Sequence, residues 1–216
     1  MPTDIVVPLR NEIEMMKMAK RLGYDTLVMA YTKEPKDALV PPEGLKIWIA
    51  SLEKPAQWAT LCLARAKPDS RALFEHGALD GVYGLETVTP KDFIHHRGSG
   101  LNTVLADIAS RKKKAVVFDF SILLNNTGGD RGVLIGRMSQ NIKICRKSKP
   151  PLAIGSFATT PYRMRAPHDL RAVFEMIGMH PAEAKEAIEY MGRAAFSRDE
   201  IKKGKAIGNA VRAVKE

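Results

Sequence analysis

The sequence predicts an α/β fold on three observations: recurring short apolar runs, helical periodicity between them, and no low-complexity linker along the chain. Alternating strands and helices favour a mainly parallel sheet, which either closes into a barrel or stays open as a doubly wound sheet. Six or seven strands joined by short helices favour the barrel. We therefore predict a TIM-barrel-like βα barrel, a single domain over residues 1–216, with extra C-terminal helices.

Six apolar runs are the predicted strands. They are continuous rather than alternating, which is typical of strands that are covered on both faces of a parallel sheet. In chain order they occupy residues 5–7, 26–30, 47–50, 81–85, 115–118 and 152–155.

Helical segments lie between these strands. Their apolar side chains recur at the spacing i, i+3, i+4, i+7, so each segment turns one apolar stripe toward the sheet. The clearest stripes lie in residues 15–22, 101–108 and 170–177. Pro55 reads as the start of a further helix that includes Leu61 and Cys62. His180 and Ser197 both read as helix starts in the last part of the chain, which looks entirely helical.

The cysteine content and the N-terminal residues bear on where the protein works. Cys62 and Cys145 lack the CxxC spacing of a zinc or redox site, so a reduced, buried pair fits best. No apolar run is long enough to predict a membrane span, and residues 1–7 do not resemble a secretory signal. We expect a cytoplasmic protein with no membrane partner.

The net charge of +10 comes from 34 Lys and Arg against 24 Asp and Glu, and its distribution is uneven. Residues 1–110 hold 13 basic and 14 acidic side chains, whereas residues 111–216 hold 21 and 10. A basic half of this kind favours a polyanionic partner, and phosphate backbones are the commonest partner of that sort. The alternative is an ordinary solvated surface.

Groups suited to catalysis are scarce. Barrel enzymes carry reactive groups at the C-terminal ends of their strands, where this sequence offers the scattered carboxylates Glu53 and Glu86. The five histidines form no HxH or HExxH pair. We therefore predict no catalytic residue, and no metal or other cofactor bound by the protein itself. Asp119 lies inside an apolar run and needs a partner if it is buried, most simply an arginine of the barrel.

Cationic side chains gather on one predicted helix, residues 131–149. Its apolar stripe lies opposite Lys143, Arg146 and Lys147, which gives the helix a cationic outer face. Lys112 belongs to a basic run at another predicted helix C-terminus, where the helix dipole also favours positive charge. RNA contact and a plain solvated face are equal alternatives for the helix.

Two loops carry arginines that can meet phosphate groups. Residues 96–102 place Arg97, Ser99 and two glycines directly before a helix, where a guanidinium and backbone amides can bind an anion together. A second loop, also before a helix, holds Arg163 and Arg165. The alternative for each loop is a local Arg–Asp clamp that fixes its shape.

Three segments occur in a recognisable order along the chain. They are Arg97-Gly98-Ser99-Gly100-Leu101-Asn102, then residues 140–147 leading into 153–156, then Arg165-Ala166-Pro167-His168-Asp169-Leu170. In order and spacing they resemble segments of the eukaryotic and archaeal ribonuclease P protein component 3 family. That family has Arg-x-Ser-Gly-Leu-Asn at the first segment and Arg-Ser-Pro-Arg-Asp-Leu at the third. The sequence departs from the family at Gly98, Ala166 and His168.

The resemblance implies a barrel related to the PHP metallohydrolases but without their full metal site. It also implies pairing with ribonuclease P protein component 2 as a two-plus-two heterotetramer, and assembly with the other protein subunits. The chain would bind and stabilise the ribonuclease P RNA, which with bound Mg²⁺ removes the 5′ leader of precursor tRNA. The holoenzyme is then the endoribonuclease, the isolated protein has no active site, and precursor tRNA is a partner only indirectly.

The candidate RNA contacts come from the two loops, the basic segments and the resemblance. They are Arg97, Ser99, Lys112, Lys143, Arg146, Lys147, Arg163 and Arg165. Two alternatives stay open. One is a stand-alone PHP-like, metal-dependent phosphoesterase, and the other is a structural scaffold that binds the protein partner but no RNA.

Overall fold

Seven parallel strands form one sheet in the computed structural model, which describes residues 1–36, 39–203, 206–207 and 211–212. Each strand pairs with the next one along the chain. They are β1 (Thr3–Val6), β2 (Thr26–Tyr31), β3 (Lys46–Leu52), β4 (Leu61–Arg65), β5 (Gly81–Tyr83), β6 (Ala115–Asp119) and β7 (Leu152–Gly155). All six predicted strands are among them.

The first and last strands meet, so the sheet is a nearly closed barrel. Val6 forms a parallel bridge with Ala158, just beyond β7. Val7 N donates to Ala158 O at 2.9 Å, and Phe157 N donates to Ile5 O at 2.7 Å. These bonds continue the parallel pattern around the seam, and the predicted TIM-like βα barrel is confirmed.

Strand β4 differs from the expectation drawn from the sequence. The helix predicted to start at Pro55 is wrong, because a loop follows Pro55 and Leu61 begins a strand. Leu61 and Leu63 pack with side chains of the other strands in the barrel interior, whereas Cys62 and Ala64 pack in a separate cluster. Because both faces are buried, the run shows no alternation of apolar and polar residues that would mark a strand.

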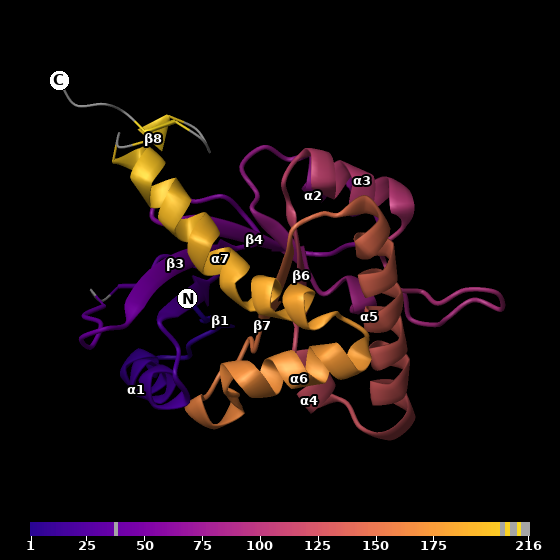
Figure 1. Cartoon of the computed structure of the whole chain (residues 1–216), viewed down its shortest axis with the longest axis horizontal. Coiled ribbons are helices and arrows are strands. Elements are labelled where there is room, and N and C mark those ends of the chain that lie inside the picture. Colours follow the sequence, from indigo (N-terminus) through magenta and orange to yellow (C-terminus); the bar gives the residue numbers. More distant parts are fainter. Residues whose placement is uncertain (37–38, 204–205, 208–210, 213–216) are drawn as a thin grey trace.

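Helices pack around the outside of the barrel (Figure 1). They are α1 (Glu12–Leu22), α2 (Arg71–Glu75), α3 (Thr103–Arg111), α4 (Ser121–Asn125), α5 (Gly128–Ser148) and α6 (Pro167–Ile177), with 3-10 turns η1 (Leu85–Thr87) and η2 (Pro161–Arg163). The largest apolar cluster lies between strands β5, β6 and β7 and the helices α3, α5 and α6. The predicted helical stripes lie on α1, α3 and α6, except for Leu101, which precedes α3.

The last long helix, α7 (Pro181–Lys202), crosses the strands instead of lying beside one of them (Figure 1). Gly192 packs against Thr3 and Thr26, which begin β1 and β2. Met191 joins the apolar cluster of the barrel interior. The helix therefore closes the end of the barrel at which the strands begin.

Helix α7 runs without a break through Ser197, so the second helix start predicted there is wrong. Neither glycine nor proline interrupts residues 193–203, and Arg198 anchors this part of the helix through an ion pair with Asp80. Beyond it the structure describes two short antiparallel strands, β8 (Ala206–Ile207) and β9 (Val211–Arg212), so the prediction that the last part of the chain is entirely helical is wrong. None of the helices in the described ranges is both long and apolar enough to cross a membrane.

Candidate nucleic-acid interface

The structure divides the residues predicted to contact RNA into two groups. One group lies on α5, at the end of α3 and in the loop before α3; its members are Arg97, Ser99, Lys112, Lys143, Arg146 and Lys147. The other group, Arg163 and Arg165, lies on η2 and directly before α6. Packing of α3 against α5 brings the members of the first group together.

Five exposed cations form what we call the α3–α5 cluster: Arg111, Lys112, Lys113, Lys147 and Lys149. The two helix ends that carry them are joined, because Ser110 Oγ donates to Lys149 O at 3.3 Å. Within the described part of the chain, none of the five enters an ion pair. Two helix C-termini favour positive charge here. The cluster also creates a positive potential that attracts polyanions.

Two lysines near this cluster have different environments. Lys143 is exposed one turn before Lys147 and extends the positive surface along α5. Lys114, the last residue of the basic run, is buried, and its Nζ donates to Gly77 O at 2.8 Å and to Leu79 O. Lys143 can therefore face a ligand in solution, whereas Lys114 holds a loop.

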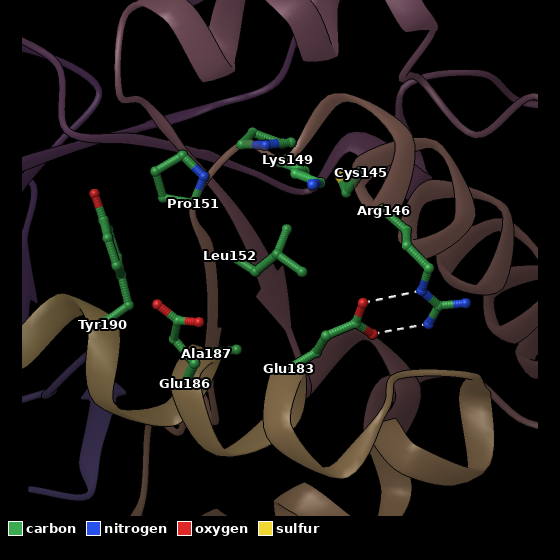
Figure 2. A pocket seen from close by; sticks show the side chains of 10 residues that line it. Cys145, Arg146, Lys149, Pro151, Leu152, Glu183, Glu186, Ala187 and Tyr190 are labelled. Atoms are coloured by element: carbon green, nitrogen blue, oxygen red, sulfur yellow. Dashed lines mark hydrogen bonds and ion pairs between the residues drawn. The ribbon is translucent and has the colours of Figure 1, made fainter.

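Arg146 links α5 to the start of α7 (Figure 2). Its Nε and Nη2 donate to the two carboxylate oxygens of Glu183 at 2.9 and 2.8 Å, and Nη2 also donates to Gly178 O at 2.8 Å. Such bidentate, charge-assisted pairing is strong and directional. The guanidinium of Arg146 thus already donates hydrogen bonds to protein acceptors. We therefore expect Arg146 to contribute less to RNA binding than Lys143 or Lys147.

The Arg146–Glu183 pair makes stability depend on pH. Hydrogen bonds from Arg146 lower the pKa of Glu183 from its ordinary 4.5 to about 2. A depressed folded-state pKa stabilises the fold above the unfolded pKa, and this contribution is lost as pH falls through about 2. We expect Glu183→Gln to lower the free energy of unfolding in urea at neutral pH, and the difference to shrink as pH falls toward 2. A difference that stays constant with pH would contradict this.

A cavity of about 450 Å³ lies beside this pair. Figure 2 shows its walls, which include Lys149 before β7 and both Glu186 and Tyr190 on α7. Cys145 also lines it, but burial raises the pKa of that thiol to about 12. A thiol in this state is a poor nucleophile. Because Lys149 belongs to both, the cavity adjoins the α3–α5 cluster.

Residues 88–98, which we call the projecting loop, extend away from the barrel beside α5 (Figure 1). The buried guanidinium of Arg137 holds the base of the loop. Its Nε donates to Asp92 Oδ1 at 2.7 Å, and its Nη1 donates to Glu86 O at 2.8 Å and Thr89 O at 2.6 Å. The sequence reasoning missed Arg137, although its position on the apolar side of the predicted helix, next to Met138, marks it for burial.

The residues after the loop fasten it to α5. Gln140 Nε2 donates to Ser99 Oγ at 3.0 Å, and Asn141 Nδ2 donates to Ser99 O at 2.9 Å. Gly100 has φ +71°, and a side chain there would collide with the carbonyl of Leu85, so glycine is required. Ser99 is 1% exposed. Its hydroxyl meets protein groups, so the phosphate contact expected there would require this turn to open.

Arg97 belongs to the projecting loop, and its side chain reaches solvent over α5. It is 49% exposed, and its Nη1 lies 3.7 Å from Asp92 Oδ2, so the local Arg–Asp contact considered for this loop is present. The guanidinium lies against Gly136, where a Cβ atom would collide with it. The absence of a side chain at Gly136 therefore determines where Arg97 can lie.

The second group is tied to its surroundings. Arg165 Nη1 donates to Tyr162 O at 3.1 Å, while Arg165 O accepts from Tyr24 OH at 2.8 Å. The guanidinium of Arg163 donates to Asn125 Oδ1. Among the described residues neither arginine forms the Arg–Asp clamp considered for this loop. Both guanidiniums remain partly exposed.

Two buried carboxylates lie near the C-terminal ends of the strands. Asp119 Oδ1 accepts from Ser121 N at 2.8 Å, and burial raises its pKa to about 6. Among the described residues Asp119 forms no ion pair with the arginine predicted for it, although the charge of Arg65 acts to lower that pKa. Glu86 accepts from Asn141 Nδ2 at 3.1 Å, and burial raises its pKa to about 7. Over the ranges that the structure describes, no three His, Cys, Asp or Glu side chains are grouped so as to hold a metal ion.

Solved structures share this barrel. A chain of an amidohydrolase matches it with a TM-score of 0.56 and 10% identity, covering 93% of this chain and 75% of that chain. A chain in a cryo-EM structure of archaeal ribonuclease P with mature tRNA matches with a TM-score of 0.76 and 21% identity, covering 99% and 98%. At these identities the likeness establishes the fold. Fold and surface together define a protein with an amidohydrolase-like βα barrel and an exposed cationic cluster.

Sequence comparison identifies the family. The pattern described as RNase P subunit p30 matches residues 90–203. A relative from Methanococcoides burtonii, called ribonuclease P protein component 3, is 32% identical over 187 residues, which are 81% of this chain and 76% of the relative. Its namesake from Methanosarcina mazei is 25% identical over 197 residues, covering 86% and 82%. The chain belongs to the RNase P subunit p30 family, and the resemblance carried by its three segments is confirmed.

Proposed function

We propose that this chain is the protein component 3 subunit of an archaeal ribonuclease P and that it binds and stabilises the catalytic RNA. The α3–α5 cluster is the observation that carries the proposal, since its five exposed cations have no acidic partner among the described residues. Lysine and arginine contacts to phosphates dominate the affinity of most nucleic-acid-binding proteins. Lys143 and Arg97 extend the same surface along α5.

The candidate contacts have unequal roles in this proposal. Lys112, Lys143, Lys147 and Arg97 bind phosphates directly, and Arg163 and Arg165 form a second contact. Arg146 and Ser99 support the surface from within, because their polar groups already bond to protein. Catalysis belongs to the RNA and its Mg²⁺, while the protein neutralises charge so that the RNA can fold closely.

The proposed assembly is cytoplasmic. This chain pairs with ribonuclease P protein component 2 as a two-plus-two heterotetramer and joins the other protein subunits on the RNA. Precursor tRNA is reached through the RNA rather than by a site on this chain. Support comes from the family and from the match to a chain in archaeal ribonuclease P with mature tRNA.

Reconstitution tests the proposal. Cleavage of precursor tRNA by the ribonuclease P RNA is measured in modest Mg²⁺ with component 2 present, and this chain is added or withheld. We expect stimulation only when both proteins are present. Cleavage by this chain without the RNA would instead favour the phosphoesterase alternative, with which the amidohydrolase-like fold is compatible. Binding to component 2 without any effect on the RNA would favour the scaffold.

Gly136→Ala tests whether Arg97 is held in place for RNA. The new methyl group displaces the flexible guanidinium, while alanine favours a helix interior over glycine by about 1 kcal/mol. We therefore expect RNA affinity to fall as far as it does in Arg97→Ala, with thermal stability kept or raised.

The matched control is Gly132→Ala on the same helix, where nothing lies within 4 Å of the added Cβ. It should gain stability and bind RNA as the unmodified chain does. Full RNA affinity in Gly136→Ala would show that the position of Arg97 does not matter.

A further inference from the structure

Two large apolar side chains are exposed at the tip of the projecting loop. Phe93 is 56% exposed and Ile94 is 96% exposed. Phe93 stacks on His96 with ring centroids 4.5 Å apart and an interplanar angle of 19°. Phe93 N also donates to His96 O at 2.9 Å, which closes the turn. The tip therefore presents a flat pair of rings and a neighbouring aliphatic side chain to solvent.

The tip stands on an anchored base. Asp92 Oδ1 accepts both from Arg137 Nε at 2.7 Å and from Gly98 N at 2.8 Å, so one carboxylate joins the two arms of the loop to α5. Single apolar side chains are common on protein surfaces. A stacked pair of rings on a loop that a buried arginine fixes is a more specific feature than a single exposed side chain. The base of the loop holds its tip at a set place beside the cationic surface of α5.

The charges around the tip fit a nucleic acid. Lys91 and Arg97 flank it, and Asp92, the one acid in residues 88–98, pairs with Arg137 and Arg97. The apolar surface is only two side chains wide, far less than the roughly 800 Å² per partner of a stable protein interface. It does match the face of a base, which stacks on aromatic rings without regard to sequence.

We propose that the tip of the projecting loop binds unpaired bases of the RNA, with one base stacking on the Phe93–His96 pair and Ile94 contacting its neighbour. The inference rests on the proposed function and adds the class of RNA element to it: a single-stranded or loop segment whose bases are free. Double-stranded RNA keeps its bases stacked inside the helix, so it offers the tip no such surface. The α3–α5 cluster, in contrast, binds the phosphates of both single-stranded and double-stranded RNA.

Phe93→Ala tests the proposal with two probes, the ribonuclease P RNA and a perfect RNA duplex, each titrated at several salt concentrations. Loss of one stacked base is expected to weaken binding of the ribonuclease P RNA roughly 5- to 150-fold. Binding of the duplex stays unchanged. The dependence of affinity on salt also stays unchanged, because no phosphate contact is lost. Phe93→Trp, which keeps a stacking surface, is expected to bind as the unmodified chain does.

Lys113→Gln in the α3–α5 cluster is the control. It is expected to weaken binding of both probes and to reduce the slope of log affinity against log salt by about one. Thermal unfolding of both variants is expected to match that of the unmodified chain, because both side chains are exposed.

The outcomes separate this proposal from the proposed function. If Phe93→Ala binds the ribonuclease P RNA normally while Lys113→Gln binds it weakly, the tip proposal is overturned and the proposed function stands. If neither variant changes RNA affinity, both are overturned. Loss of component 2 binding with RNA affinity intact would also overturn the tip proposal, since the tip would then contact protein.

Discussion

Arg137→Met is expected to lower the free energy of unfolding by about 1–3 kcal/mol for each buried carbonyl that it leaves without a donor, and to free the projecting loop. The side chain of Arg137 is 4% exposed, and it donates to Asp92, Glu86 O and Thr89 O. Methionine is apolar and of similar length but donates nothing, so buried acceptors lose their partner. Chemical denaturation measures the stability, and limited proteolysis within residues 88–98 measures the opening of the loop.

Arg193→Met is the matched control for this change. Arg193 pairs with Glu186 and Glu189 on α7, and its side chain is 47% exposed. Ion pairs at such exposure contribute about 0–1 kcal/mol, so we expect little loss of stability and no new cleavage. An Arg137→Met protein that is as stable as this control would show that the loop is held by other contacts.

Replacing four lysines of the α3–α5 cluster by glutamine is expected to remove most of the RNA affinity. The changes are made together at Lys112, Lys113, Lys147 and Lys149. Each lost phosphate contact lowers the slope of log affinity against log salt by about 0.7 to 0.9, so four lower it by about 3 and weaken binding on the order of 100- to 1000-fold at low salt. Filter binding over a salt series measures both quantities.

A second quadruple variant controls for net charge. Lys17, Lys33, Lys54 and Lys185 are exposed and lie outside the cluster. Replacing these four by glutamine changes the net charge by the same amount but leaves the α3–α5 cluster intact. Equal loss of affinity in both variants would mean that the RNA responds to total charge and not to this surface.

The barrel could be predicted from the sequence because its strands and helices carry strong local patterns. Strands buried on both faces read as short apolar runs, and α1, α3, α5 and α6 each show an apolar stripe. Strand β4 could not be told from a helix, since its run is short and follows Pro55, a residue that often opens helices. The helix start predicted at Ser197 is wrong for a related reason. A local capping pattern is outweighed there by contacts with distant residues, such as the ion pair of Arg198 with Asp80.

The site was less predictable because its geometry depends on residues far apart in the chain. The sequence predicted Lys143, Arg146 and Lys147 on one cationic face. Glu183, whose carboxylate accepts hydrogen bonds from the Arg146 guanidinium, lies 37 residues away along the chain. The segment after Arg97 illustrates the same limit. Its composition indicates an anion site, whereas its buried serine and constrained glycine hold the projecting loop against α5.

The position of α7 has a consequence for how the barrel is made in the cell. Gly192 packs on Thr3 and Thr26, so β1 and β2 meet the helix that completes the interior only after every other strand of the barrel has been synthesised. Contacts between such distant residues form slowly. Until α7 leaves the ribosome, the apolar interior stays open to other nascent chains, which exposes it to aggregation. Completion of this barrel therefore waits until α7 has been synthesised and has left the ribosome.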